Sequence, residues 1–156
     1  MNPFLIQEIK GTFDAANKRL VIVMERITHG SLEHLLQDAI DKNYRIKEEV
    51  IWTILAQVIY AMAFLNSLEI KHRDLKPENI LMNGPSGPFK VGLFSEVTSD
   101  ENSTTSFEFR SPEDLQNLDT IDERSDVWSL GITIYKLMHK EFPFPTNNHH
   151  AFMDFL

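Results

Sequence analysis

The chain has no cysteine in its 156 residues, which excludes disulfide bonds and cysteine-bound zinc. It also has no apolar run long enough to cross a bilayer, because the longest, 51–65, is interrupted by Thr53 and Gln57. No cluster of Lys and Arg is long enough to make a nucleic-acid-binding face, and the formal net charge is −8. We therefore expect no membrane segment and no nucleic-acid partner, and we expect a cytoplasmic protein.

Glycine is also scarce, which limits how the chain can hold a phosphate group. The six glycines lie at positions 11, 30, 84, 87, 92 and 131, and no G-x-G-x-x-G loop can be made from them. Because that kind of loop covers the phosphates of a nucleotide, we expect this cover to be missing. Apolar residues make up 42% of the chain, enough for one buried core, and the length suits a single domain.

Apolar periodicity predicts helices separated by short strands. The strongest helix is expected over 47–66, where apolar residues recur every three or four positions. A helix over 126–138 is apolar on nearly every face, so we expect it to be buried, and Ser31 is suited to cap a helix over 32–40. The other expected elements are hairpin strands 5–12 and 20–24 around a turn at 14–17, strands 80–82 and 89–93, a loop over 95–111, and a helix starting at 147.

One run of eight residues combines an imidazole, two bases, an acid and an amide: His72-Arg73-Asp74-Leu75-Lys76-Pro77-Glu78-Asn79. It resembles the H-R-D-L-x-x-x-N catalytic loop of eukaryotic protein kinases, and its Lys76 resembles the serine/threonine branch. The resemblance implies an α+β, protein-kinase-like fold: a mainly helical large lobe with a remnant small-lobe hairpin and hinge. Residues 1–156 would be a partial kinase domain, with the hairpin and hinge over 1–30 and a large lobe, incomplete at its C-terminus, over 31–156.

The predicted hinge region also resembles that of protein kinases. The run 21–25 resembles the fifth strand of the small lobe and the start of the hinge, which makes Met24 similar to the gatekeeper residue. Glu25 and Ile27 would then offer backbone groups to an adenine ring. Leu81 would line the same adenine pocket.

Further motifs continue the likeness downstream. Residues 111–113 resemble the A-P-E element, and 126–131 resemble the start of the central helix of the large lobe. The stretch from Phe109 to Phe144 is most similar to the NIMA-related kinases. In the family, the acid at Glu113 pairs with a later arginine, so we expect a buried carboxylate without its partner here.

The resemblance assigns a role to each residue of the loop. Asp74 would accept the proton of a substrate hydroxyl, Lys76 would offset charge on the transferred phosphoryl group, and Asn79 would bind magnesium through its amide oxygen. The alternative is that the three only hold local hydrogen bonds, and we expect them to be idle. His72 would pack beneath the loop, and Asp126 would hydrogen-bond its backbone amides.

One further role, that of the loop arginine, depends on a modification. Arg73 would pair with a phosphorylated residue in the run 103–106, unless that Ser/Thr-rich run is only a solvated loop.

A single substitution decides the expected mechanism. The family's D-F-G aspartate holds magnesium, but Leu93 stands at that position, after Lys90-Val91-Gly92. A hydrocarbon side chain cannot bind an ion that requires oxygen ligands, and a register slip that brings in Glu96 is the weaker alternative. The lysine-bearing strand that the family places before its fourth strand is also expected to be missing. ATP and magnesium are thus cofactors by resemblance that we do not expect to bind productively.

We therefore predict a catalytically inactive pseudokinase that acts by protein–protein interaction, with another kinase as one candidate partner. One alternative is a fragment of an active ATP-dependent protein serine/threonine kinase, and another is a decayed product that never reaches one folded state. The open edge of a lone hairpin and the incomplete large lobe also predict low stability or dependence on a partner.

Overall fold

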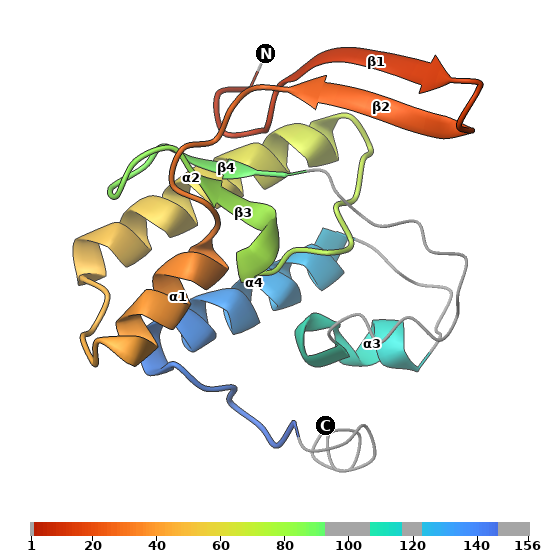
Figure 1. Ribbon diagram of the computed structural model, residues 1–156. Coiled ribbons are helices and arrows are strands. Elements are labelled where there is room, and N and C mark those ends of the chain that lie inside the picture. Colours follow the sequence, from red (N-terminus) through yellow and green to blue (C-terminus); the bar gives the residue numbers. More distant parts are fainter. Residues whose placement is uncertain (1, 93–106, 117–122, 147–156) are drawn as a thin grey trace.

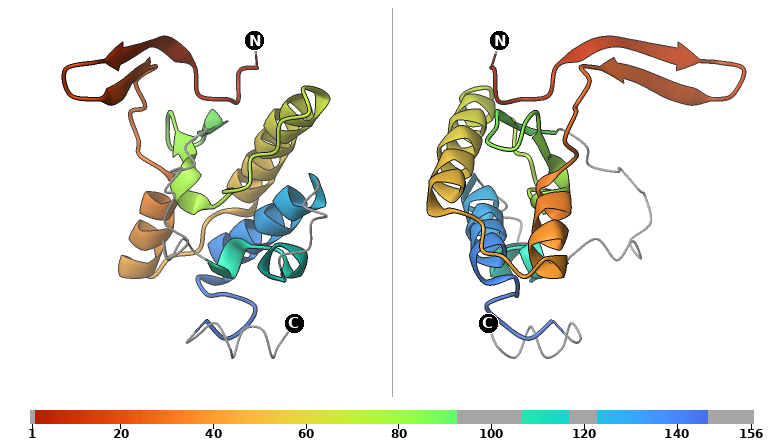
Figure 2. Two further views of the ribbon diagram at one scale, coloured as in Figure 1. Left: turned by 90° about the vertical axis from the view of Figure 1, so that its right-hand side faces the viewer. Right: turned by 60° about the vertical axis from the view of Figure 1, so that its left-hand side comes forward.

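The computed structural model describes residues 2–92, 107–116 and 123–146. A helical body carries two small antiparallel sheets, and one of them, a long hairpin, extends away from the helices (Figures 1 and 2). This arrangement confirms the predicted α+β class with a mainly helical large lobe. Sequence predictions for residues 95–106 and for the helix starting at 147 lie outside the described residues.

Helices α1 (Leu32–Asp41) and α2 (Glu48–Ser67) confirm the two predicted from periodicity. At the start of α1, the Ser31 N–H donates to Nδ1 of His34 at 3.2 Å, and the Ser31 hydroxyl lies 2.9 Å from the same nitrogen. Ser31 is therefore the N-cap residue, as predicted. The buried stripe of α2 recurs every three or four positions: Ile51, Ile54, Val58, Ala61 and Leu65.

Helix α2 also has an outer face that is largely exposed, although Phe4 contacts the Tyr60 ring there edge-on at 5.6 Å between centroids. By length and composition alone it is long and apolar enough to cross a membrane, a property that the core helix of a water-soluble protein also has. Here its buried stripe packs into the core with α1, β3 and β4, while Trp52, Ile59 and Tyr60 are exposed. The expectation of no membrane segment stays a prediction.

The hairpin begins later than the sequence suggested. Strand β1 (Glu8–Asp14) pairs antiparallel with β2 (Arg19–Met24), with Gly11 opposite Ile22. The prediction that the first strand begins at residue 5 is wrong, because residues 4–6 pair elsewhere. The Ile6 N–H donates to the Val91 carbonyl at 2.9 Å, and the Val91 N–H donates to the Phe4 carbonyl at 2.8 Å. These bonds pair the backbone N–H and carbonyl of Val91 in the buried strand β4. A buried backbone group that is left unpaired costs more free energy than one exposed to water.

The second sheet carries the core strands β3 (Ile80–Met82) and β4 (Phe89–Val91). Both predicted strands are present, although β4 ends two residues earlier than expected. Their buried residues join those of the helices in one main cluster: Leu32, Leu36, Ile51, Ile54, Val58, Ala61, Leu75, Ile80, Met82, Phe89, Val91, Leu130 and Leu137.

Helix α4 (Glu123–His139) is present where predicted, but the prediction that it is buried inside the domain is correct for one side of the helix only. Val127 and Met138 are 61% and 52% exposed, whereas Ser129 and Thr133 are buried. The Ser129 hydroxyl donates to the Phe109 carbonyl at 2.7 Å, so this small polar residue on the inner face satisfies neighbouring backbone. The apolar outer face of α4 is therefore left beside that of α2.

The last residues of the segment 95–111, which was predicted to be a loop, form regular structure instead. Residues Phe107–Phe109 form a 3-10 turn, η2, and α3 (Pro112–Leu115) follows. Phe109 is buried in a second, smaller cluster with Ile132 and Phe144, so one aromatic side chain fixes a segment that looked like loop by composition.

Candidate functional site

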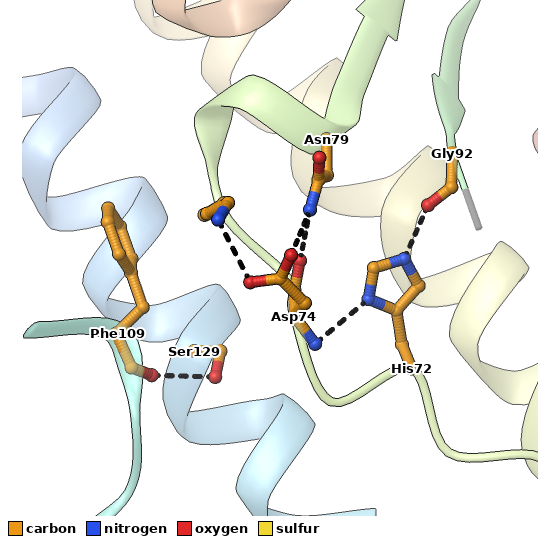
Figure 3. A network of polar contacts seen from close by, with 7 residues as sticks. His72, Asp74, Asn79, Gly92, Phe109 and Ser129 are labelled. Carbon is orange, nitrogen blue, oxygen red and sulfur yellow. Dashed lines mark hydrogen bonds and ion pairs between the residues drawn. The ribbon is translucent and has the colours of Figure 1, made fainter. Parts of the chain in front are cut away.

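The three predicted catalytic residues lie together in one hydrogen-bonded group (Figure 3). Lys76 Nζ is 3.1 Å from Asp74 Oδ1. The Asn79 side-chain amide donates to Asp74 Oδ2 at 2.8 Å and to the Asp74 backbone carbonyl at 2.7 Å. The short 3-10 turn η1 (Pro77–Asn79) brings Asn79 back over Asp74, and its proline fixes the first backbone angle of that turn. The carboxylate of Asp74 is thus held between a cation and an amide.

Two backbone amides of the loop are held by a single carboxylate on α4. The N–H groups of His72 and Arg73 donate to the two oxygens of Asp126 at 2.9 and 2.8 Å. Arg73 has a φ of 66°, a left-handed conformation that a non-glycine residue adopts only when its surroundings impose it. The predicted bracing role of Asp126 is confirmed.

His72 is part of the support of the loop, as predicted. Its side chain is buried, and Nε2 lies 2.6 Å from the Gly92 carbonyl, while the Asp74 N–H points to Nδ1 at 3.3 Å. An Nε2–H donor with Nδ1 as acceptor satisfies both contacts. The imidazole therefore links the catalytic loop to the end of β4 (Figure 3).

The hinge residues are held by an ion pair that the sequence did not reveal. Lys90 Nζ donates to both carboxylate oxygens of Glu25 at 2.6 and 2.8 Å, and the Gln7 N–H donates to the same carboxylate at 2.9 Å. Leu81 lies opposite Lys90 in the β3–β4 ladder, and Met24 and Ile27 are half-buried at either side of Glu25. The predicted adenine-pocket residues are brought to one region, but the Glu25 side chain is engaged with β4. No local pattern links an acid and a base 65 positions apart.

This environment lowers the pKa of the Glu25 carboxyl. Burial alone would raise its pKa, but the hydrogen bonds from Lys90 and the Gln7 amide, with the charge of Lys90, outweigh burial and hold the pKa below its ordinary value of 4.5. A carboxyl whose pKa is lower in the folded state stabilises the fold fully when the pH is above its unfolded-state pKa. That stabilisation is lost as the pH falls through the folded-state pKa.

Replacing Lys90 by methionine is expected to reduce the free energy of unfolding by about 1–2 kcal/mol at pH 7, because it leaves a partly buried carboxylate without its cation. The difference from the wild type should shrink as the pH falls from 4.5 through the lowered folded-state pKa of Glu25, because protonation removes the charge that Lys90 stabilises. Urea titrations at pH 7 and pH 3 measure both effects. Lys10→Met, at an exposed lysine of β1, is the matched control, and an equal loss from Lys90→Met at both pH values would contradict the pair's role.

In the A-P-E-like element, residues 111–113, the acid Glu113 is more exposed than expected. Glu113 is exposed on α3, so the prediction of a buried carboxylate without a partner is wrong. Solvent stabilises the charge there, and no large penalty arises. Ser111 begins the helix by accepting the Asp114 N–H at 3.3 Å, and Ser125 donates to Asp114 at 3.1 Å.

The residues of the loop do not fit a magnesium ion well. Magnesium requires near-octahedral oxygen coordination and is usually held by one or two carboxylates. The Asn79 amide nitrogen donates to Asp74, which leaves its oxygen, the atom expected to bind magnesium, outside these contacts. The Asp74 carboxylate, however, is already paired with Lys76. Position 93 is a leucine, which has no oxygen ligand to offer. Leu93 and the run 103–106 lie outside the described residues. The roles of Asp74, Lys76 and Asn79 in chemistry stay predictions.

Comparison with known proteins agrees with this fold and loop. Residues 2–155 match the sequence model of the protein kinase domain. The chain is 33% identical over 136 residues to the MAP kinase kinase MKK1/SSP32 of Saccharomyces cerevisiae, an alignment that covers 83% of this chain and 26% of that protein. It is 31% identical over 144 residues to the probable serine/threonine-protein kinase nek2 of Dictyostelium discoideum, covering 86% of this chain and 34% of that protein.

A third relative belongs to another group of kinases. Myosin light chain kinase 2 of Bos taurus is 32% identical over 132 residues, covering 80% of this chain and 20% of that protein. The similar identities do not single out the NIMA-related group, and the chain spans only about a quarter to a third of the length of the first two relatives above. The match to the kinase domain over nearly the whole chain establishes the family: this chain belongs to the protein kinase family.

Proposed function

We propose that this chain is a catalytically inactive member of the protein kinase family, a pseudokinase of the cytoplasm that acts by binding a protein partner such as another kinase. The observation that carries the proposal is Leu93, at the position where the family's magnesium-binding aspartate stands. Transfer of a phosphoryl group depends almost entirely on positioning and on charge stabilisation by metal ions and cations. Removing one preorganised electrostatic contact typically lowers the rate by about 10²–10³.

The geometry of the loop supports a structural role for the retained residues. Asp74 is held by Lys76 at 3.1 Å and by Asn79 at 2.8 Å. Asp126 and His72 then connect the loop to α4 and β4. These contacts stabilise the loop whether or not the chain catalyses a reaction. The absence of cysteine supports the cytoplasmic part of the proposal.

A second candidate function is that of a segment from an active ATP-dependent protein serine/threonine kinase. It is favoured by the same group of side chains, since Asp74, Lys76 and Asn79 are of the residue types that the family uses and lie within hydrogen-bonding reach of one another. In that case Asp74 would accept the proton of the substrate hydroxyl and Lys76 would offset charge on the phosphoryl group.

Nucleotide binding separates the two candidates. Thermal unfolding of the chain is expected to be unchanged by millimolar ATP with magnesium, because position 93 offers no oxygen ligand. A ligand present at about 100 times its dissociation constant would add about 2.7 kcal/mol of stability, which a melting curve resolves easily. The variant Leu93→Asp restores the missing carboxylate and is the matched comparison, in which any magnesium-dependent stabilisation by ATP should appear.

Transfer of labelled phosphate to a general protein substrate such as casein is the second readout. The wild-type chain is expected to show none above background. Transfer that disappears in Asp74→Asn would overturn the pseudokinase proposal and establish the active-kinase alternative. Asp74→Asn keeps the shape of the side chain, so circular dichroism can verify that the fold is retained.

A further inference from the structure

The turn between β3 and β4 contains the only Asn-Gly pair in the sequence, Asn83-Gly84. Asn83 directly follows β3, and its N–H donates to the Pro88 carbonyl at 3.0 Å across the turn. The turn lies beside the segment that leads from β2 to α1 (Figure 1), where the His29 N–H donates to the Met82 carbonyl at 3.1 Å. The position of Asn83 is therefore fixed both within its turn and relative to this segment.

The backbone nitrogen of Gly84 is available for reaction. Gly84 has a φ of 135°, a conformation that residues with a side chain rarely adopt. Among the described residues, none accepts a hydrogen bond from the Gly84 N–H. Because glycine has no Cβ, its nitrogen can approach the side-chain Cγ of Asn83 more closely than the nitrogen of any other residue type could.

The side-chain carbonyl of Asn83 is the end of a chain of hydrogen bonds. The Thr28 hydroxyl donates to Asn83 Oδ1 at 3.0 Å, and the same hydroxyl oxygen lies 2.8 Å from Nδ1 of His29. Because a hydroxyl has one hydrogen, the Thr28 oxygen accepts from the Nδ1–H of His29 in this arrangement. Hydrogen bonds in a chain polarise one another. The chain therefore makes Cγ of Asn83 a better electrophile and stabilises negative charge that develops on Oδ1.

We propose that Asn83 is a site of spontaneous deamidation, promoted by the hydroxyl of Thr28 and the imidazole of His29. Asparagine is one of the thermolabile residue types in proteins. The Gly84 nitrogen attacks Cγ of Asn83, so that an N–Cγ bond forms and the nitrogen loses its proton to solvent. The Cγ–Nδ2 bond then breaks, and the leaving nitrogen takes up a proton and departs as ammonia. Water opens the resulting succinimide ring at either carbonyl, which gives aspartate or isoaspartate, and no group is oxidised or reduced.

The two products differ in what they do to the turn. Both place a carboxylate beside the segment between β2 and α1, but only isoaspartate lengthens the main chain, because the chain then runs through the former side chain. The added carbon lies directly after the hydrogen bond from the Asn83 N–H to Pro88. It also lies next to the bond from the Met82 N–H to the Gly30 carbonyl at 2.7 Å, which joins β3 to the segment before α1. The inference does not rest on the proposed function.

Incubation of the folded chain at pH 8, followed by peptide mapping with mass spectrometry, tests the site. Asn83 is expected to convert faster than Asn17, which lies exposed in the hairpin turn but is followed by Lys18. Thr28→Val removes the hydroxyl and keeps the shape of the side chain. It should slow conversion of Asn83 by about two- to tenfold, the effect expected for one hydrogen bond that water can partly replace. Thr28→Ser keeps the hydroxyl and should convert at nearly the wild-type rate.

Two controls separate the contact from the Asn-Gly pair itself. Thr12→Val, at an exposed threonine of β1, makes the same chemical change elsewhere and should leave the rate at Asn83 unchanged. In urea at a concentration that unfolds the chain, the wild type and Thr28→Val should convert at equal rates, because the contact exists only in the folded state. Gly84 itself is unsuitable for substitution, since a Cβ there would lie 2.7 Å from the Gly87 carbonyl oxygen and distort the turn.

Three results would overturn the proposal. Conversion of Asn83 no faster than that of Asn17 would remove the site. Equal rates in folded wild type and folded Thr28→Val would show that the hydroxyl does not promote the reaction. A difference between these two proteins that persists in urea would show that it does not arise from the folded contact. Circular dichroism of each variant before incubation verifies that the compared proteins share one fold.

Discussion

Replacing Asp126 by alanine is expected to lower the free energy of unfolding by about 3–5 kcal/mol. The carboxylate is buried and accepts the backbone N–H groups of His72 and Arg73 at 2.9 and 2.8 Å. Its removal leaves two donors without acceptors, and each buried unsatisfied group costs about 1–3 kcal/mol. It also releases Arg73 from a left-handed conformation that the hydrogen bond helps to hold. Urea titrations followed by circular dichroism should show a lower midpoint with the same slope.

Two further variants show whether the effect belongs to these hydrogen bonds. Asp126→Asn keeps the shape and one acceptor oxygen, so it should lose roughly half as much stability as alanine does. Glu113→Gln changes an exposed carboxylate and should stay within about 0.5 kcal/mol of the wild type. A loss below about 1 kcal/mol in Asp126→Ala would show that the catalytic loop holds its conformation without this residue.

The elements that the sequence predicted well are those whose pattern is local. The apolar positions of α2 repeat at helical spacing, and the order of residues 72–79 is itself the motif, so both could be read without knowing what lies nearby. Ser31 is a further case, since a capping residue acts on its own helix.

The errors occur where distant segments compete. Residues 4–6 pair with Val91 rather than with the hairpin, because the edge of a buried strand offers a better partner than exposed backbone does. The expectation that α4 is buried was wrong on one side of the helix for a related reason. Its apolar residues are spread over most of the circumference, and only the position of α2 and Phe109 decides which of them are covered.

The candidate site shows the same division. Asp74, Lys76 and Asn79 come from one short run and were found together, whereas the Lys90–Glu25 pair joins two segments with no common motif. Asp126 could be assigned only through the family resemblance, since nothing local to α4 marks a buried acid as the acceptor of two amides. Physical contacts across long sequence separations thus carry the part of the site that pattern alone does not predict.

Replacing Phe89 by alanine is expected to be the most damaging single change in the core. Phe89 is fully buried in β4 opposite Met82, and its N–H donates to the Gln57 side chain on α2 at 2.7 Å. Truncating a buried phenylalanine costs about 3–5 kcal/mol, through lost burial and the cavity left behind. Because small domains have only about 5–15 kcal/mol of stability in total, this variant should lose a large share of its free energy of unfolding and melt at a clearly lower temperature than the wild type.

The hairpin supplies a control of identical chemistry. Phe13 on β1 is 64% exposed, so Phe13→Ala removes the same atoms from a site where water already contacts them, and its effect should stay near 0.5 kcal/mol. Melting curves of the two variants under the same conditions give the comparison directly. Similar losses in both would mean that β4 does not pack between α2 and β3 as the structure has it, and the support of the catalytic loop through Gly92 would then have to be abandoned as well.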